Sequence, residues 1–281
     1  MAVRFNWLIG LLFYFAQSIQ AATPPSRIVS MNLCADQLLL LLAEPNQIAA
    51  LTQLSHDPDA SYYQPQALRY PINKGLAEEI LPFKPDLVIN GEYGHAATVQ
   101  LLQKLGIHVE TLPMANTLDD VFKNLRQIGT LVGQQARAET IIQQMQNRLN
   151  QLQPAPQHAP LAAIYDANGY TEGNASLRGQ MLSKAGWQNA AERAGINSYG
   201  RILLEDLIRL KPDVLIESPY RASAYSRAQA LTQHPALKRG QFAPRIIKVP
   251  SKLTICEGPW LVDVIEQLQA ERIKLGTHKA H

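Results

Sequence analysis

Aromatic and hydrogen-bonding side chains gather in six short segments, residues 30–34, 56–63, 92–93, 166–170, 220–221 and 252–260, each shortly after an apolar run. Such runs are typical of buried parallel strands, and ligands of parallel sheets bind beyond the carboxyl ends of the strands. Aromatic faces bury the organic part of a ligand, while arginine and lysine bind its anionic groups. These residues predict non-covalent capture of a bulky ligand by Ser30, Asn32, Cys34, Tyr62, Tyr63, Tyr93, Tyr170, Tyr220, Arg221, Lys252 and Trp260.

Several of these side chains also have a purely structural interpretation. A loop aromatic can simply cover the core, and Asn32 can cap a helix that begins near Cys34. Arg221 can be an ordinary surface cation. Its planar guanidinium nevertheless makes it the best match in these loops for an anionic group, because the fork binds a carboxylate through two hydrogen bonds.

The residue spacing supports catalysis or the binding of a free metal ion less well than it supports the capture of an organic ligand. The chain has no Gly-x-Ser-x-Gly and no His-Glu-x-x-His pattern, so an exported enzyme would have to use Cys34 as its nucleophile. A receptor for free zinc or manganese would need about three histidines and a carboxylate in one cleft, and only His56 and His95 are well placed. We therefore expect no resident metal site and no enzyme activity. A scaffold protein without any ligand is the third alternative.

The two cysteines, Cys34 and Cys256, fall in the first and the last of these segments. An even number of cysteines in an exported chain is compatible with a disulfide. A bridge would link the two lobes covalently, provided that the Cα atoms come within about 7 Å. The alternative is two separate, small buried residues.

An internal repeat indicates the elements that position these loops. Residues 76–89 align with residues 203–216 at an offset of 127 (from 76 to 203), with six identical positions, and Tyr93 then aligns with Tyr220. Each copy is an amphipathic helix that ends at Lys-Pro, followed by a short apolar strand, because proline disfavours the helical conformation of the residue before it. The repeat predicts two lobes of related build.

The alternation of strand and helix patterns predicts an α/β fold. Its two lobes would each have a mostly parallel sheet flanked by helices, and one long α-helix would join them. The expected strands are 27–30, 48–52, 87–90, 108–112, 161–165, 214–217 and 246–249, and the expected helices outside the repeat are 35–42, 97–105 and 261–275. We expect lobes at residues 23–116 and 154–281, with the linking helix at 117–153.

The linking helix rests on a helical period of apolar residues from 117 to 152. Unbroken, it would be about 54 Å long and would reach from one lobe to the other. Gly129 and Gly133 each cost about 1 kcal/mol relative to alanine and are the places where it would break instead.

The N-terminus and the overall charge bear on location and partners. Residues 1–22 combine one arginine, an apolar core and a small Ala-Ala end, which predicts a cleaved signal peptide and a soluble periplasmic protein; an uncleaved anchor is the alternative. The chain has 26 basic and 23 acidic residues and a net charge of +3, which makes nucleic acid a poor partner. We expect a monomer.

The segment 27–38, the Lys-Pro-Asp block at 76–89, the long linking segment and Pro259-Trp260 together resemble the periplasmic binding proteins of ABC importers for ferric siderophores and cobalamin. This resemblance covers nearly all of the chain after residue 22. It implies two lobes on a rigid helical backbone, an iron or cobalt chelate held between them without any cofactor of the protein's own, and delivery to an ABC importer permease.

The same resemblance implies one glutamate on each lobe that docks onto permease arginines, and the matching positions are Glu78 and Glu205. Without the resemblance, each is equally well an acidic residue near a helix N-terminus. Cobalamin receptors of this kind have a tryptophan just after the first repeat strand, where this chain has Glu92-Tyr93. A ferric siderophore is therefore the first expectation for the ligand and cobalamin the second.

Overall fold

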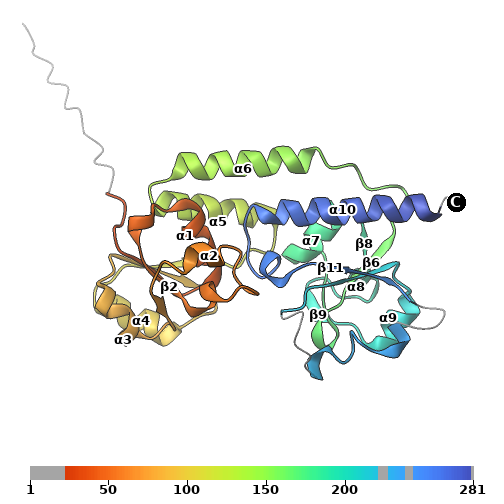
Figure 1. The fold of residues 1–281 in the computed structure, drawn as a ribbon, viewed down its shortest axis with the longest axis horizontal. Helices are drawn as coiled ribbons and strands as arrows, with labels where there is room; N and C mark the ends of the chain where they lie inside the picture. Colours follow the sequence, from red (N-terminus) through yellow and green to blue (C-terminus); the bar gives the residue numbers. More distant parts are fainter. Residues whose placement is uncertain (1–22, 221–226, 238–242, 280–281) are drawn as a thin grey trace, which may run out of the picture.

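The computed structural model describes residues 23–220, 227–237 and 243–279, and it shows two α/β lobes side by side (Figure 1). The predicted signal peptide at residues 1–22 and the candidate binding residue Arg221 lie outside the described residues. The α/β fold with parallel sheets flanked by helices is confirmed. None of the helices within the described ranges is apolar over a length that would cross a membrane.

The first lobe is built on a five-stranded parallel sheet in the order β3-β2-β1-β4-β5. Alternate residues of a strand point to opposite faces. Ile28 packs on one side with helices α1 and α5, and Val29 packs on the other with α3 and α4, so both faces are buried. The elements are β1 (Ile28–Ser30), α1 (Leu33–Leu42), β2 (Ile48–Thr52), α2 (Gln64–Ala67), β3 (Ile72–Asn73), α3 (Ala77–Ile80), β4 (Leu87–Gly91), α4 (Ala96–Lys104) and β5 (Val109–Leu112).

The second lobe has a four-stranded parallel sheet in the order β11-β10-β6-β8 and a separate antiparallel pair, β7 and β9. Its sheet is also covered on both faces, with α7 and α10 on one and α8 and α9 on the other. The elements are β6 (Leu161–Ile164), β7 (Tyr170–Glu172), α7 (Leu177–Lys184), β8 (Gln188–Asn189), α8 (Ala190–Arg193), β9 (Tyr199–Arg201), α9 (Leu204–Leu210), β10 (Val214–Glu217), β11 (Arg245–Lys248) and α10 (Trp260–Lys279).

The single linking helix expected over 117–153 is wrong. The segment forms two helices, α5 (Leu118–Leu131) and α6 (Gln135–Asn150), which pack against each other. The break comes at Gly133, whose φ of +75° is left-handed and favours glycine. Gly129 permits the close approach, because a Cβ there would lie 2.6 Å from the Cβ of Ala138. The glycines that weaken a straight helix therefore make the turn of a helix pair.

Helix α6 alone now makes the crossing, and its 16 residues correspond to about 24 Å. Figure 1 shows α6 lying along α5 and then along the start of α10, on the same side of both lobes. Arg148 near its end donates to Asp263 at 2.5 Å and to Glu266 at 2.6 Å on α10. One apolar core continues from α1 through α5 and α6 to α10, so the lobes share a common helical layer.

The internal repeat corresponds to equivalent structures in the two lobes. Lys84 and Lys211, the residues before the two prolines, both take a left-handed conformation, with φ of 47° and 48°. Lys84 ends the 3-10 extension of α3, and Lys211 ends α9. Glu78 and Glu205 both occupy the second position of their helices. The repeat therefore predicts the same helix, turn and strand in each lobe.

Candidate functional site

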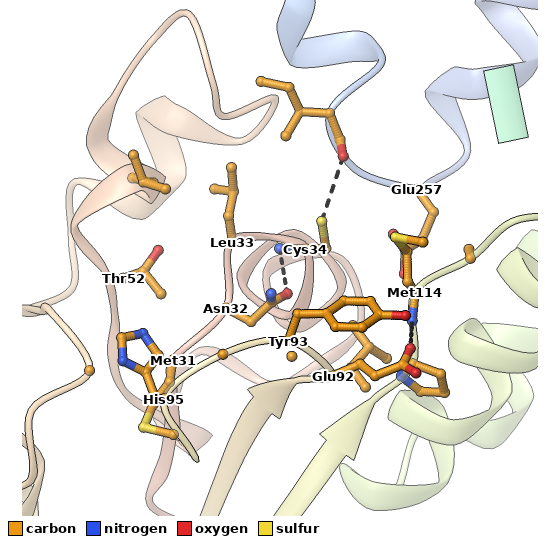
Figure 2. Close-up of a pocket in the computed structure, with 18 of the residues that line it drawn as sticks. Met31, Asn32, Leu33, Cys34, Thr52, Glu92, Tyr93, His95, Met114 and Glu257 are labelled. Atoms are coloured by element: carbon orange, nitrogen blue, oxygen red, sulfur yellow. Dashed lines mark hydrogen bonds between the residues drawn. The ribbon is translucent and has the colours of Figure 1, made fainter. Parts of the chain in front are cut away.

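A cleft of about 820 Å³ lies between the lobes and is lined by residues from both (Figure 2). Its first wall comes from the segments that follow β1, β2, β3, β4 and β5, and its second wall comes from β7, β9, the start of α7 and the loop before α10. The four predicted residues that line it are Asn32, Cys34, Tyr93 and Tyr170. Its volume suits a ligand of a few dozen atoms, larger than a bare ion.

Asn32 combines the two roles that the sequence left open. Its Oδ1 accepts hydrogen bonds from the backbone N–H groups of Cys34 and Ala35 at 2.9 and 3.0 Å, which caps α1. Its side chain also lies close to Gly91, where a Cβ would come within 2.3 Å of Nδ2. The cap thus holds Asn32 in the cleft wall.

Tyr93 is the most exposed large hydrophobic side chain of the first wall, with 80% of its surface accessible. It follows β4 within the segment Glu92-Tyr93-Gly94-His95, every residue of which lines the cleft. The neighbouring Glu92 is held by the backbone N–H of Met114, which donates to Oε2 at 3.0 Å. An exposed aromatic ring on an anchored turn is well suited to stack on a ligand.

The second wall contains a buried ion-pair cluster that the sequence analysis missed. The Nη1 of Arg178 lies 2.7 Å from Asp166 and 3.2 Å from Glu172, and its Nη2 donates to Ser218 at 3.1 Å. Burial alone would lower the pKa of Arg178, but the two carboxylates raise it above its ordinary value. Arg178 is not among the predicted site residues because it lies within α7, whereas that prediction rests on loops that follow strands.

Tyr170 and Tyr199 stand beside this cluster on the paired strands β7 and β9. Burial raises the pKa of both phenols, and the charge of Glu172 raises each further. Tyr199 also donates to Asn116 of the first-lobe side at 2.8 Å. Tyr170 is a predicted site residue, whereas Glu172 and Tyr199 are not; the alternating strand pattern around them is too short to detect.

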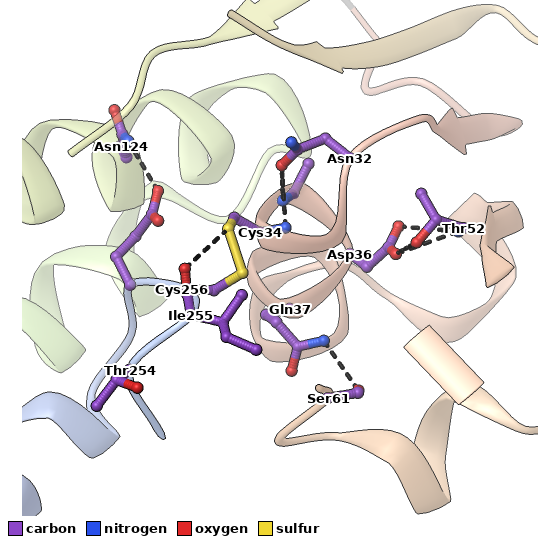
Figure 3. The surroundings of a disulfide bond; sticks show 12 residues. Asn32, Cys34, Asp36, Gln37, Thr52, Ser61, Asn124, Thr254, Ile255 and Cys256 are labelled. Carbon is purple, nitrogen blue, oxygen red and sulfur yellow. Dashed lines mark hydrogen bonds between the residues drawn. A yellow bond between two sulfur atoms is a disulfide. The ribbon is translucent and has the colours of Figure 1, made fainter. Parts of the chain in front are cut away.

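Cys34 and Cys256 form a disulfide with a Cα separation of 5.0 Å (Figure 3). The bridge joins the start of α1 in the first lobe to the loop before α10. The next residue, Glu257, accepts a hydrogen bond from Asn124 of α5 at 2.9 Å, and burial raises its pKa. Because Cys34 is bridged, it has no free thiolate, and the enzyme alternative based on it loses its nucleophile.

Tyr62, Tyr63 and Trp260 do not line the described cleft, contrary to expectation. Tyr62 stacks on Trp260 at a ring distance of 4.6 Å, and Tyr63 meets both rings edge-on. Trp260 is only 2% exposed, and its Nε1 donates to the carbonyl of Cys256 at 3.2 Å. The three rings form an aromatic cluster between the lobes, because their apolar faces are buried more completely against each other than along an open cleft.

Three further predicted residues also lie off the described lining. Ser30 is fully buried and donates to the carbonyl of Asn32. Tyr220 donates to Asp57 at 2.8 Å, which ties the second lobe to the first. Lys252 is half-buried in a short 3-10 segment, outside the cleft wall. Next to it, Ser251 donates to the carbonyl of Asp59 at 2.6 Å, so this region serves contact between the lobes.

Glu78 and Glu205 are exposed on their helices. Within the part of the chain that the structure describes, neither forms a hydrogen bond or an ion pair, whereas their neighbours do: Glu79 accepts from the backbone N–H of Lys74, and Asp206 pairs with Arg209. Figure 1 places α3 and α9 on the side of the two lobes that faces away from α6. The two glutamates are thus free for an external partner.

The described residues include no cluster of three histidine, cysteine or carboxylate side chains that could hold a metal ion. His95 lines the cleft, but His56 contacts the carbonyl of Ala67 through its Nε2 at 3.0 Å instead. The two histidines that a free-metal receptor would use are therefore not brought together.

Comparison with known proteins gives consistent results. Residues 28–243 match the family model described as periplasmic binding protein. The "ABC transporter substrate-binding lipoprotein YvrC" of Bacillus subtilis is 25% identical over 72% of this chain, and the match spans 66% of that relative, just under two thirds of its length. The vitamin B12-binding protein of Pectobacterium atrosepticum is 27% identical over 77% of this chain and 78% of its own.

Solved structures share the fold at low identity. The periplasmic heme binding protein HutB of Vibrio cholerae superposes with a TM-score of 0.71 at 20% identity, covering 87% of this chain and 97% of its own. The vitamin B12 binding protein BtuF of the same organism gives a TM-score of 0.61 at 19% identity, with coverage of 88% and 96%. With the family model matching most of its length, this chain belongs to the periplasmic binding protein family.

Proposed function

We propose that this protein is the periplasmic receptor of an ABC importer and captures a metal chelate in the cleft between its lobes. A ferric siderophore is the first candidate ligand and a cobalamin the second. The observation that carries the proposal is the cleft itself: about 820 Å³, walled by both lobes beyond their strand ends, with exposed Tyr93 on one side and Tyr170 and Tyr199 on the other.

Cobalamin is kept as the second candidate because relatives at 27% identity are named vitamin B12-binding proteins. Haem becomes a further candidate through structural neighbours named for heme binding, although their 17–24% identity supports only the shared fold. The aromatic rings supply broad apolar contact to any of these chelates. Polar groups of the second wall would then orient the ligand.

Closure of the lobes on the ligand is expected to be small. The reason is not a single rigid helix but several connections between the lobes. The lobes are joined by the disulfide, by the contacts of Asp57 and Asp59 with the second lobe, and by the shared layer of α5, α6 and α10. Packed layers rock by sliding over short distances, whereas wide hinge motion needs free loops. The receptor would therefore bind in a nearly preformed cleft.

Delivery to the permease would use Glu78 and Glu205. They are exposed, unpaired within the described chain and at equivalent positions of the two lobes. A permease with two-fold symmetry offers two equivalent cationic sites, and a receptor with two equivalent carboxylates complements them. The receptor itself would act as a monomer, reaching the periplasm through the segment 1–22.

The test is a calorimetric titration of the purified chain lacking residues 1–22. The ligands are ferric siderophores, cobalamins and haem, with free zinc and manganese ions to test the rival metal receptor. We expect one chelate to bind with 1:1 stoichiometry and a dissociation constant in the micromolar range or below, and we expect Tyr93→Ala to weaken it. Saturable binding of the free ions alone, or of nothing in the panel, would refute the proposal.

A further inference from the structure

The charges in the described cleft lining are unequally available to a ligand. Three carboxylates contribute to the lining, Glu92 on the first wall and Glu172 and Glu257 on the second. The described lining has two permanently charged cations, Lys74 and Arg178. Lys74 is exposed, so that water and salt screen its charge, whereas the two second-wall carboxylates are buried.

Arg178 is not free to bind an anion. Its side chain is 12% exposed, and Nη1 is shared between Asp166 at 2.7 Å and Glu172 at 3.2 Å, while Nη2 is donated to Ser218. One guanidinium facing two carboxylates leaves the cluster with a net negative charge. An anionic ligand group that approached Arg178 would have to displace a buried ion pair, which is costly.

Of the two carboxylates, Glu172 lies farther from Arg178, so its charge is the less completely neutralised. Glu172 also lines the cleft. It is 6% exposed, and the tyrosines on either side of it respond to it: after burial, its negative charge is the largest cause of the raised pKa of both Tyr170 and Tyr199. A buried charge in a medium of low polarity acts over a longer range than an exposed one. A ligand between these two phenols would experience the same negative field.

Glu257 and Glu92 add a further carboxyl group to each wall of the cleft. Glu257 is 5% exposed, and its described side-chain partner is the amide of Asn124, which is neutral. Glu92 faces the cleft from the other lobe and is anchored by the backbone of Met114 rather than by a cation. Both walls therefore carry a carboxylate that no described cation neutralises.

Resting on the proposed function, we propose that this cleft selects metal chelates that carry no net negative charge and prefers those that are positively charged, with Glu172, Glu257 and Glu92 as the selecting groups. A cationic chelate gains attraction from the carboxylates of Glu172 and Glu257, which are already desolvated, whereas an anionic one loses its hydration and finds only the solvent-screened Lys74 as a free cation in the described lining. The cleft thus discriminates against haem, with its carboxylates, and against tricatecholate and citrate complexes of iron.

The test uses chelates that differ in charge on an unchanged core. Ferrioxamine B, with its free ammonium group, is compared with its neutral N-acetyl and its anionic N-succinyl derivatives. Aquacobalamin, cyanocobalamin and a cobalamin monocarboxylate form a second series. In the series that binds, we expect affinity to fall from cationic to neutral to anionic, by at least about ten-fold overall, equivalent to about 1.4 kcal/mol.

Variants then assign the preference to residues. Glu172→Gln and Glu257→Gln should each reduce the ratio between cationic and anionic affinities by roughly three- to ten-fold. Glu92→Gln gives the same test without altering a buried residue, because the Glu92 side chain is exposed. The glutamine keeps an oxygen that can accept from the Met114 N–H. Glu139→Gln, exposed on α6, removes the same charge outside the cleft and should leave the ratio unchanged.

Arg221→Ala separates this inference from its opposite. If the ligand is anionic and held by Arg221, that variant loses affinity while the three glutamine variants gain it, and the inference is overturned. A flat or reversed order of affinities within a binding series also overturns it, while leaving the receptor function intact. Binding of no ferric siderophore, cobalamin or haem would overturn the proposed function and this inference with it.

Discussion

The two lobes are alike where they repeat in sequence and unlike where they meet the cleft. Lys84 and Lys211 adopt the same left-handed turn, and Glu78 and Glu205 occupy the same helix position. The first cleft wall, however, is a set of strand-end turns around Tyr93, whereas the second holds the buried cluster of Arg178. The two lobes are thus equivalent at the surface that would meet a symmetric partner and different at the surface that would meet an asymmetric ligand.

Removing the covalent link between the lobes is expected to have the largest effect. The disulfide closes a sequence separation of 222 residues, so replacing Cys34 and Cys256 together by serine should lower the free energy of unfolding by about 4 kcal/mol. Urea unfolding followed by circular dichroism measures this difference. A loss below about 1 kcal/mol would show that the shared helical layer alone holds the lobes together.

A pH-dependent difference should come next, because Asp166 and Asp36, one largely enclosed carboxylate from each lobe, have different partners. In the second lobe Asp166 is paired with Arg178, but in the first lobe burial raises the pKa of Asp36 to about 7, despite its hydrogen bonds with Thr52. The folded state thus binds a proton more tightly than the unfolded state. Stability from this group is complete below about pH 4 and is lost as pH rises through about 7.

Asp36→Asn removes that dependence. Relative to the wild type, the variant should gain about 4 kcal/mol of unfolding free energy between pH 4 and pH 8. Chemical unfolding at several pH values gives the comparison, with Asp59→Asn, on an exposed side chain, as the control. Parallel pH profiles of wild type and Asp36→Asn would show that Asp36 is ionised in the folded protein throughout.

The third prediction tests the equivalence of the two lobes at the permease. Glu78→Ala combined with Glu205→Ala should lower uptake of the transported chelate about 100-fold, equivalent to about 2.7 kcal/mol, without changing its affinity for the receptor. Either single variant should have a smaller effect. Uptake of labelled chelate by cells and calorimetry on the purified protein are the paired measurements.

Glu79→Ala combined with Asp206→Ala is the matched control, since these neighbours already have partners within the chain. Uptake should be largely retained in this variant. Equal losses in both double variants would indicate a general need for acidic helices and not for two specific glutamates.

The smallest expected effect distinguishes the two repeat tyrosines. Tyr93 lies in the cleft with 80% of its surface exposed, whereas Tyr220 is 42% exposed and bonded to Asp57. Tyr93→Ala should weaken chelate binding about ten-fold, or 1.4 kcal/mol, while Tyr220→Ala should change it less than two-fold. Similar losses in titrations of the two variants would mean that the repeat extends to ligand contacts.

The comparison of the lobes also explains which parts of the site were predictable. Asn32, Cys34, Tyr93 and Tyr170 each follow a strand closely, so strand order alone places them at the cleft. Tyr62, Tyr63 and Trp260 satisfy the same rule but bury their rings against each other. The rule identifies the end of a sheet and does not say whether a ring there faces a ligand or another ring.

The role of Arg178 and the break between α5 and α6 were not predicted from the sequence, for two different reasons. Arg178 is drawn to the cleft by Asp166 and Glu172, which are 12 and 6 residues away in sequence but belong to a loop and a strand that only the folded lobe brings together. At Gly133 the apolar period continues on both sides, because α5 and α6 each bury one face. The helical period of apolar residues is therefore the same for one straight helix and for two helices packed against each other.

The amino-acid sequence by itself determined the two related lobes, the parallel strands, the equivalent glutamates and the positions of the cysteines, because these depend on local periodicity, on proline and on repetition along the chain. Only the tertiary structure decided that the cysteines join, that the linking segment folds back on itself, and which charges face the cleft. Those outcomes depend on distances between segments far apart in the chain, and burial then determines which partner each side chain finds.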